Sequence, residues 1–318
     1  MKARCVQVIL ASGDPTGVLI ADLDNWIGRL IVVSRNRLEL LAERQEARGG
    51  GVYVLVGPDP DAPSRDAVYV GETDAVMKRL VQHAKSQSKD FWTRAVFVVS
   101  REGSLTKSEV RYLESQLLAL VRSSGRARVV NSSNPGVPDL PEGDRIRMQG
   151  FLDRLQLVLP VLGFSVTLPR SSVETGEMVG QSMVERPTAR TGATATVRSG
   201  LFVLNRVGVR ATGQDVNGEL VIMKGSTARR TGVKSWTQYR SLREQLVSTG
   251  ILVDGDQPDT LVFTEDTAFA SPSAAEAVVM ARAGAGGKFF VQPDTGISYK
   301  EYRAAKLRAA AESAGVQS

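Results

Sequence analysis

Two tyrosines occur at matched places in two neighbouring apolar runs. Tyr53 lies in GVYVLVG at 51–57, and Tyr69 lies in VYVG at 68–71. Alternation of this kind predicts strands, whose side chains point to opposite faces by turns. If the two strands pair antiparallel, both phenols can lie on one face, and the register decides whether they meet. Each tyrosine also fits an ordinary strand aromatic with its hydroxyl at the surface.

Two cationic or titratable groups follow on a predicted helix. The helix is expected to begin at Thr73 or Asp74 as N-cap, with an apolar stripe that includes Leu80. Arg79 and His83, the chain's single histidine, lie one turn apart at the edge of that stripe. Side chains there lean toward a neighbouring sheet. Alone, the pair also fits two solvated surface residues, but its position directly after the two tyrosine strands favours a shared site.

A carboxylate occupies an unusual place on a later helix. Thr106 and Glu109 form a capping box that opens the helix, and Gly125 ends it. Glu114 falls inside the apolar stripe of this helix. The stripe consists of Val110, Leu113, Leu117, Leu118 and Val121. A carboxylate in such a place costs several kcal/mol unless it is paired, protonated or metal-bound, so either a metal site or an ion pair with a buried arginine such as Arg79 is expected.

Composition limits the class of protein. The chain carries 40 Lys and Arg against 34 Asp and Glu, which gives a net charge of +6. This excess is compatible with an anionic partner but is also common in soluble proteins. Cys5 is the only cysteine, which excludes an internal disulfide and fits a reducing compartment. The longest apolar stretch, 155–168, is broken by Pro160 and Gly163 and is too short to span a membrane. We therefore expect a cytoplasmic protein without a membrane partner.

Composition and periodicity also divide the chain into six parts. We expect a β-rich extension with a helix at 1–48, a central block at 49–135, a helical extension at 136–168, a flexible linker at 169–200, an accessory domain at 201–302 and a basic helical tail at 303–318. Strands are predicted at 5–10, 17–23, 30–33, 94–100, 218–224 and 261–264, and helices at 36–47, 144–159, 238–248 and 300–311. Ser271 followed by Pro272 predicts a further helix start.

The ordered set of motifs in the central block resembles the GIY-YIG nucleases. Gly51-Val52-Tyr53 corresponds to the first triplet and Tyr69-Val70-Gly71 to the second, with Val in place of Ile in both. Arg79 and His83, Glu114 and Asn131 follow in the family's order. The leading segment and the KGSTARR and FASPSAAEAVV motifs at 224–230 and 269–279 are similar to a bacterial subgroup with an N-terminal extension and a C-terminal domain of unknown function.

The resemblance implies a fold and a chemistry. The fold is α+β, a small mixed or antiparallel three-stranded sheet flanked by helices, followed by a linker and a second small α+β domain. The activity is metal-dependent endonucleolytic hydrolysis of DNA phosphodiester bonds. Glu114 would hold Mg²⁺ or Mn²⁺, which stabilises the leaving 3′ oxygen, and Arg79 would offset charge in the transition state. Tyr53 is the expected base, its pKa lowered by nearby positive charge. Tyr69 and His83 would orient the water or phosphate, and Asn131 would position or support the site.

Basic residues suggest where nucleic acid would bind. Lys85 and Lys89 follow the histidine-bearing helix. Lys224, Arg229 and Arg230 lie near Trp236 in the accessory domain, with Lys234 between them and the tryptophan. They fit phosphate contacts with aromatic support, and they also fit solvated loop charge. The accessory domain would direct the nuclease to its DNA or to a protein partner, a second copy of the chain included.

Two alternative functions remain open from the sequence. One is a catalytically inactive nucleic-acid-binding or complex-forming protein on the same scaffold. The other is an RNA-processing enzyme, because phosphate chemistry does not report the sugar. Glu114 discriminates against the first, since an inactive descendant has no reason to keep a carboxylate in an apolar stripe.

Overall fold

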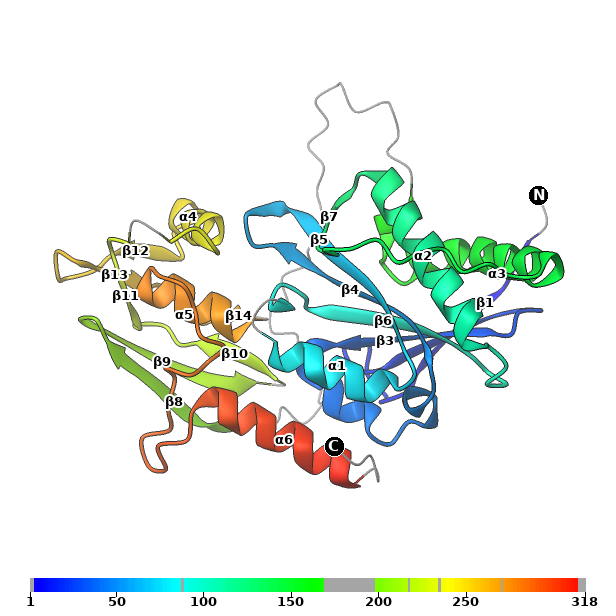
Figure 1. Cartoon of the computed structure of the whole chain (residues 1–318). Coiled ribbons are helices and arrows are strands. Elements are labelled where there is room, and N and C mark those ends of the chain that lie inside the picture. Colours follow the sequence, from blue (N-terminus) through cyan, green and yellow to red (C-terminus); the bar gives the residue numbers. More distant parts are fainter. Residues whose placement is uncertain are drawn as a thin grey trace.

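The computed structural model describes residues 3–86, 89–168, 198–216, 218–233, 236–269 and 271–313. It is an α+β protein built around several sheets. Figure 1 shows a larger N-terminal module, a smaller C-terminal module beside it, and a last helix, α6, that runs from the smaller module along the larger one. The predicted linker at 169–200 lies outside the described residues up to 197, and residues 198–200 already belong to a strand.

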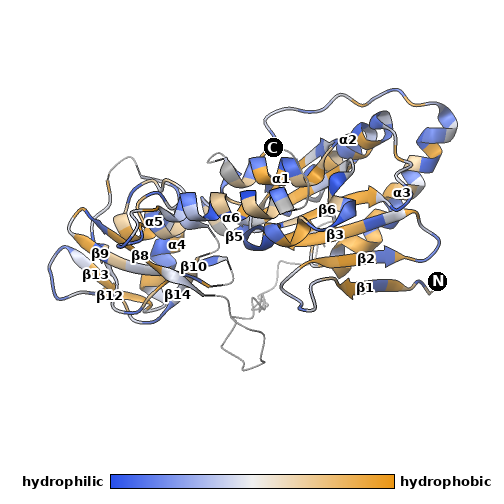
Figure 2. Cartoon of the chain, turned by 90° about the horizontal axis from the view of Figure 1, so that it is seen from below, coloured by the Kyte–Doolittle hydropathy of each residue, from blue (hydrophilic) through white to orange (hydrophobic). Residues whose placement is uncertain are grey.

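A seven-stranded sheet forms the centre of the N-terminal module. Its strands are β1 (Val6–Leu10), β2 (Leu19–Leu23), β3 (Gly28–Ser34), β4 (Gly51–Asp59), β5 (Ala62–Thr73), β6 (Arg94–Ser100) and β7 (Ala127–Val129). Their order in the sheet is β1-β2-β3-β6-β4-β5-β7. All neighbours are antiparallel except β5 and β7. Apolar residues run along β2 and β3 in Figure 2, as expected of strands covered on both faces.

The prediction of a three-stranded sheet is wrong in size. The expected strands β4, β5 and β6 are adjacent, but β3 pairs with β6 along its whole length, from Gly28 opposite Ser100 to Ser34 opposite Arg94. The leading segment is therefore part of the central sheet. The physical reason is that β6 is apolar on both faces, and pairing with β3 satisfies the backbone groups that an edge would leave exposed.

Helices cover the two faces of this sheet. On one face lie the 3₁₀ helices η1 (Arg35–Leu41) and η2 (Gln45–Arg48) and the helix α1 (Val76–Lys85). On the other lie α2 (Lys107–Ser124), α3 (Glu142–Val161) and the short η4 (Ser165–Thr167). The single helix predicted over 36–47 is instead two 3₁₀ segments, because Arg44 takes an extended conformation between them, and Arg37 departs from helical geometry inside the first.

The predicted caps of α2 are present in the structure, whereas the predicted cap of α1 is not. Thr106 and Glu109 form the predicted capping box, and Gly125 ends α2 in the left-handed conformation. The predicted cap of α1 is wrong, since Ala75 occupies the N-cap position without a side-chain bond. Thr73 lies two residues earlier, where its hydroxyl oxygen accepts a bond from the Ala75 N–H at 3.1 Å. The sequence thus predicts the polar turn before α1, but the helix itself begins at Val76.

The C-terminal module contains two sheets. One has the order β14-β10-β9-β8 and the other β11-β13-β12. The strands are β8 (Arg198–Arg206), β9 (Val209–Val216), β10 (Glu219–Ile222), β11 (Thr227–Arg229), β12 (Leu252–Asp254), β13 (Thr260–Phe263) and β14 (Thr267–Phe269). The helices are α4 (Arg240–Ser248) and α5 (Pro272–Met280). Ser271 caps α5 with Pro272 at its first position, as predicted.

The last helix, α6 (Tyr299–Ser313), belongs to both modules. Tyr299 is fully buried in the core of the C-terminal module, and Leu307 is buried in the α1-side core of the N-terminal module. The helix predicted over 300–311 is confirmed, and it crosses the domain boundary expected between residues 302 and 303, because its two ends pack in different cores. Among the described residues, no helix combines the length and apolar character needed to cross a bilayer.

Candidate functional site

The register of β4 and β5 brings the two tyrosines together. Tyr53 lies opposite Gly71, and Leu55 lies opposite Tyr69. The phenols are therefore diagonal neighbours on one face of the sheet, the face that α1 covers. Their ring centroids are 6.1 Å apart. The predicted sharing of one face is confirmed.

Gly71 makes room for Tyr53. A Cβ atom built on Gly71 would lie 2.4 Å from the Tyr53 hydroxyl oxygen and 2.5 Å from its Cζ, and 2.9 Å from a ring carbon of Tyr69. Contacts below about 3.4 Å lie on the repulsive side of the van der Waals well for carbon. The Tyr53 ring thus lies across the strand at the one position where the neighbouring strand has no side chain. The second triplet therefore carries glycine at this position because a side chain there would collide with the Tyr53 ring.

Tyr53 joins the two polar residues of α1. Its hydroxyl is 2.7 Å from His83 Nε2, and Arg79 Nε donates to the same hydroxyl at 3.3 Å. Since Arg79 can only donate, the Tyr53 oxygen accepts this bond and its own proton is available for the imidazole. Arg79 and His83 reach the phenol because they lie one turn apart on the face of α1 turned toward the sheet. Tyr53, Arg79 and His83, with the nearby Tyr69, form what we call the phenol cluster.

Burial dominates the electrostatics of the phenol cluster. Tyr53 is 0% exposed, and this burial raises its pKa well above 10.0, while the hydrogen bond from Arg79 offsets only part of the effect. Arg79 lowers the pKa of Tyr53 as expected, but burial outweighs this effect. Burial, followed by the positive charges of Lys89 and Arg79, lowers the pKa of His83 to about 3. At neutral pH the imidazole is uncharged, so its Nε2 can accept the hydrogen bond from Tyr53.

Lys89 lies over Tyr69. Its ammonium nitrogen is 2.9 Å from the centre of the Tyr69 ring, a cation–π contact. Burial, then Arg79, lowers the pKa of Lys89 to about 8, so the ammonium is still mostly charged at neutral pH. Tyr69 and Lys89 are half-buried, unlike Tyr53. Lys89 was predicted as a nucleic-acid contact on the basis of its charge, and the structure adds that it touches the phenol cluster. The side chain of Lys85 lies outside the described residues.

Glu114 approaches from the opposite side of the sheet. The apolar stripe of α2 is buried as predicted, and Glu114 is half-buried at its margin. Burial and the nearby carboxylate of Glu72 raise the pKa of Glu114, while the Glu72 backbone N–H, Arg111 and Arg79 act in the other direction. Within the described part of the chain, Glu114 forms no ion pair, so the predicted alternative of a buried pair with Arg79 is not observed.

Glu72 is a residue that the sequence reasoning missed. It follows the second triplet directly, and strand alternation places it on the same face as Val70, which packs against α2. Strand alternation alone predicts this placement, because residues two apart in a strand share a face, so Glu72 must point toward α2 as Val70 does. Glu72 and Glu114 together concentrate negative charge near Arg79.

Asn131 supports β5 rather than the reacting groups. Its amide oxygen accepts from the Val70 N–H at 3.0 Å, and its amide nitrogen donates to the Val70 carbonyl at 2.7 Å. A side-chain amide that satisfies both backbone groups of one residue replaces a strand at that point. This fits the structural role predicted for Asn131, and it fixes the backbone between Tyr69 and Gly71.

Glu114 and Glu72 are the candidate ligands for a divalent cation. Among the described residues, no group of three or more His, Cys, Asp or Glu side chains is placed to hold a metal. Mg²⁺ needs fewer protein ligands, because it keeps several waters and binds through one or two carboxylates together with substrate phosphate. Glu114 and Glu72 offer such a pair, and a cation beside them would relieve their mutual repulsion. The residues present thus fit Mg²⁺ or Mn²⁺.

The basic residues predicted to surround Trp236 gather around it only in part. Arg230 pairs with Asp254 at 2.8 Å, and Trp236 is buried with the Arg243 guanidinium 5.9 Å from its ring centre. Arg230 and Trp236 line one pocket of this module. Lys224 is exposed and Arg229 is half-buried, and Lys234 lies outside the described residues. The sequence placed these residues near one another but gave no signal that the tryptophan is buried.

Comparison with known proteins covers the C-terminal module alone. A family model described as a domain of unknown function (DUF4357) matches residues 202–303. This agrees with the resemblance noted for that part of the sequence. No GIY-YIG family model was found to match the central block, and neither a curated protein nor a solved structure matches the chain.

Proposed function

We propose that the chain is a metal-dependent endonuclease that hydrolyses DNA phosphodiester bonds at the phenol cluster. The observation that carries the proposal is the convergence of Tyr53, His83 and Arg79 within hydrogen-bonding distance, with Tyr69 beside them. A buried phenol bonded to both a neutral imidazole and a guanidinium combines a proton relay with an anion-binding group. Phosphodiester hydrolysis needs both of these.

In this proposal His83 is the final proton acceptor. The attacking water gives its proton to the Tyr53 oxygen as the Tyr53 proton passes to His83 Nε2. The imidazole is a weak base because it is buried and because Lys89 and Arg79 face it. A phosphodiester between these two cations would offset their charge and raise the pKa of His83. Substrate binding would therefore strengthen the base, whereas the sequence alone suggests Tyr53 as the base.

The remaining groups bind and orient the substrate. Arg79 presents planar donors to the phosphate, and Lys89 leaves the Tyr69 ring to contact it. Tyr69, which is half-buried, then faces the water and orients it. Glu114, with Glu72, would hold Mg²⁺ or Mn²⁺, which when bound stabilises charge on the leaving oxygen. The C-terminal module is proposed to direct the choice of substrate or partner, through its exposed Lys224 and half-buried Arg229 among other groups.

A cleavage assay tests the proposal. Wild-type protein is incubated with plasmid DNA and Mg²⁺, with EDTA as the control, and in parallel with RNA of matched length. We expect nicking of the DNA that EDTA abolishes. Glu114→Ala should lose cleavage and retain DNA binding in a gel-shift assay, whereas Glu102→Ala, an exposed carboxylate away from the cluster, should cleave normally. Full activity of Glu114→Ala would refute the metal role, and DNA binding without cleavage by the wild type would favour the inactive, binding-only alternative.

A further inference from the structure

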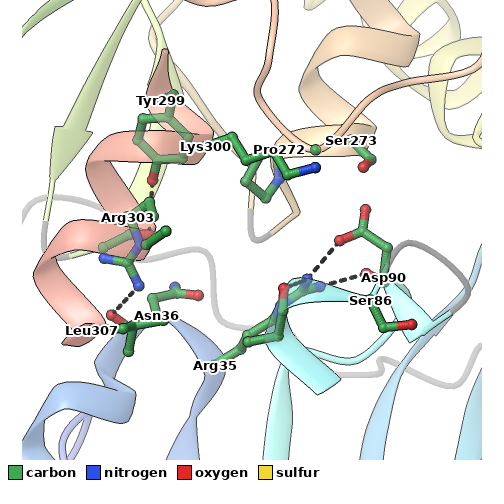
Figure 3. A pocket seen from close by; sticks show the side chains of 14 residues that line it. Arg35, Asn36, Ser86, Asp90, Pro272, Ser273, Tyr299, Lys300, Arg303 and Leu307 are labelled. Atoms are coloured by element: carbon green, nitrogen blue, oxygen red, sulfur yellow. Dashed lines mark hydrogen bonds and ion pairs between the residues drawn. The ribbon is translucent and has the colours of Figure 1, made fainter. Parts of the chain in front are cut away.

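A buried carboxylate, Asp90, lies where the two modules meet. Figure 3 shows it beside a cavity of about 110 Å³ lined from below by Arg35, Asn36 and Ser86 and from above by residues of α5 and α6. Asp90 is 9% exposed. A charge removed from water in this way is stable only if its oxygens are bonded. Its partners therefore determine where the loop that carries it can lie.

The two modules share the oxygens of Asp90. Oδ1 is 2.7 Å from an Arg35 guanidinium nitrogen of the N-terminal module. Oδ2 accepts from the Ser271 hydroxyl at 2.5 Å and from the Tyr239 hydroxyl at 3.5 Å, both of the C-terminal module. Tyr239 has a left-handed backbone with φ of 62°, uncommon for a residue with a side chain, and its N–H donates to the Pro60 carbonyl across the same boundary.

Asp90 is connected to the phenol cluster on both sides. The next residue along the chain toward the N-terminus is Lys89, whose ammonium lies on the Tyr69 ring. Arg35, besides pairing with Asp90, donates to the Ala84 carbonyl at 3.0 Å, directly after His83 in α1. The position of Asp90 thus fixes both the cation that faces His83 and the end of the helix that carries it.

We propose that the C-terminal module is a positioning element of the phenol cluster, in which Ser271 and Tyr239 hold Asp90 and thereby place Lys89 over Tyr69. The proposal rests on the proposed function in taking the phenol cluster as the active site. It assigns to Ser271, Tyr239 and Asp90 a role in a site that none of them touches. It also gives the accessory module a purpose other than DNA contact.

The single histidine of the chain provides a direct test. The groups that face His83 are Tyr53 of β4, Tyr69 of β5, Arg79 of α1 and Lys89 of the following loop. Removal of Lys89 from this set relieves a positive charge, so the His83 imidazole should become easier to protonate. The full-length protein is titrated from about pH 8 down to the acid limit of its folded state, and the Cε1–H signal of the one imidazole is followed by proton NMR. Lys89→Met serves as the positive control for the size of the response.

We expect the imidazole of Ser271→Ala combined with Tyr239→Phe to become protonated at a higher pH than that of the wild type, because the charge of Lys89 is then farther away while the burial of the ring is unchanged. Ser271→Thr, which keeps a hydroxyl and a helix cap, should behave like the wild type. Lys306→Ala is the matched control, because Lys306 pairs with Glu39 across the same boundary at 3.5 Å without touching the Asp90 loop. If the double variant proves unfolded by circular dichroism, Tyr239→Phe alone is used.

Kinetics give a second readout. The double variant should lose about tenfold in kcat/KM for an oligonucleotide, since a misplaced Lys89 contacts the substrate phosphate less well, and Lys306→Ala should retain the wild-type value. An NMR titration of a folded Tyr239→Phe/Ser271→Ala protein that coincides with the wild-type titration would overturn the positioning role. This result does not depend on cleavage, so failure of the nuclease proposal and failure of the positioning proposal are distinguishable.

Discussion

Replacement of Gly71 by alanine isolates the steric basis of the phenol cluster. Gly71 lies within an ordinary strand, so its backbone accepts alanine, and the cost comes from the new methyl group alone. That methyl would be 2.4 Å from the Tyr53 hydroxyl oxygen. A normal contact needs about 3.4 Å, so the ring or the strand must move by roughly 1 Å. Overpacking of this kind costs about 1–3 kcal/mol, and the hydrogen bond between Tyr53 and His83 would be lost or lengthened.

Urea denaturation measures this cost. With a denaturant slope of roughly 2–3 kcal/mol/M, the unfolding midpoint of Gly71→Ala should fall by about 0.3–1.5 M, and DNA cleavage should fall with it because the ring is displaced. Gly136→Ala is the control, since no atom lies within 4 Å of its added Cβ. A Gly71→Ala protein with the wild-type midpoint and an unchanged His83 NMR signal would show that Tyr53 does not lie across Gly71, and the geometry of the cluster would have to be abandoned.

Three further predictions follow from single contacts. The pKa of His83 is lowered from 6.5 to about 3, so the stability that its neutral form contributes is complete above about pH 6.5 and decreases by about 1.4 kcal/mol per pH unit as the pH falls toward 3. The urea midpoints of wild type and His83→Gln should therefore converge on acidification. A difference that stays constant with pH would contradict the shift. Asn131→Ala leaves both backbone groups of Val70 without their bonds and should lower the free energy of unfolding by about 1–3 kcal/mol, with the exposed Ser133→Ala as control; equal midpoints would refute the contact. Leu307→Ala should destabilise the N-terminal module by about 2–4 kcal/mol through the cavity it leaves, as judged by hydrogen exchange of β4 and β6, whereas the exposed Leu157→Ala should not.

The local pattern of the sequence predicts much of the fold. Alternation and apolar runs locate β1 to β4 within a few residues and β6 at its limits, 94–100. The strand predicted over 68–71 is found, but β5 already begins at Ala62, because its first residues pair with the end of β4. The caps of α2 and α5 are found because Thr, Ser, Glu, Gly and Pro act there through bonds to nearby backbone. These are short-range effects, which a single sequence contains in full.

Long-range pairing accounts for the errors. Nothing in residues 28–34 indicates that they pair with residues 94–100 and so enlarge the central sheet from three to seven strands. Likewise, the sequence predicts the helix over 300–311 but not that Tyr299 and Leu307 of this helix pack in different cores, so a domain boundary was expected inside it at residue 302. Both depend on contacts between distant parts of the chain, which local periodicity does not report.

The sequence predicts which residues of the candidate site meet, but not how deeply each of them is buried. Tyr53, Tyr69, Arg79 and His83 meet because antiparallel register and helical spacing are geometric consequences of the sequence. The pKa of Tyr53 was expected to fall and instead rises, because full burial outweighs one guanidinium. Desolvation depends on everything that surrounds a group, so it could not be weighed before the surrounding elements were placed.

The helix α6 also determines the order in which the chain can mature. Leu307 is synthesised long after Tyr53 and Met77, and it completes the core that contains them. A ribosome-bound chain can pair its strands early, but that core stays open until α6 has emerged. The phenol cluster would reach its final packing only after α6 has docked, so that chains truncated before α6 do not carry a finished site.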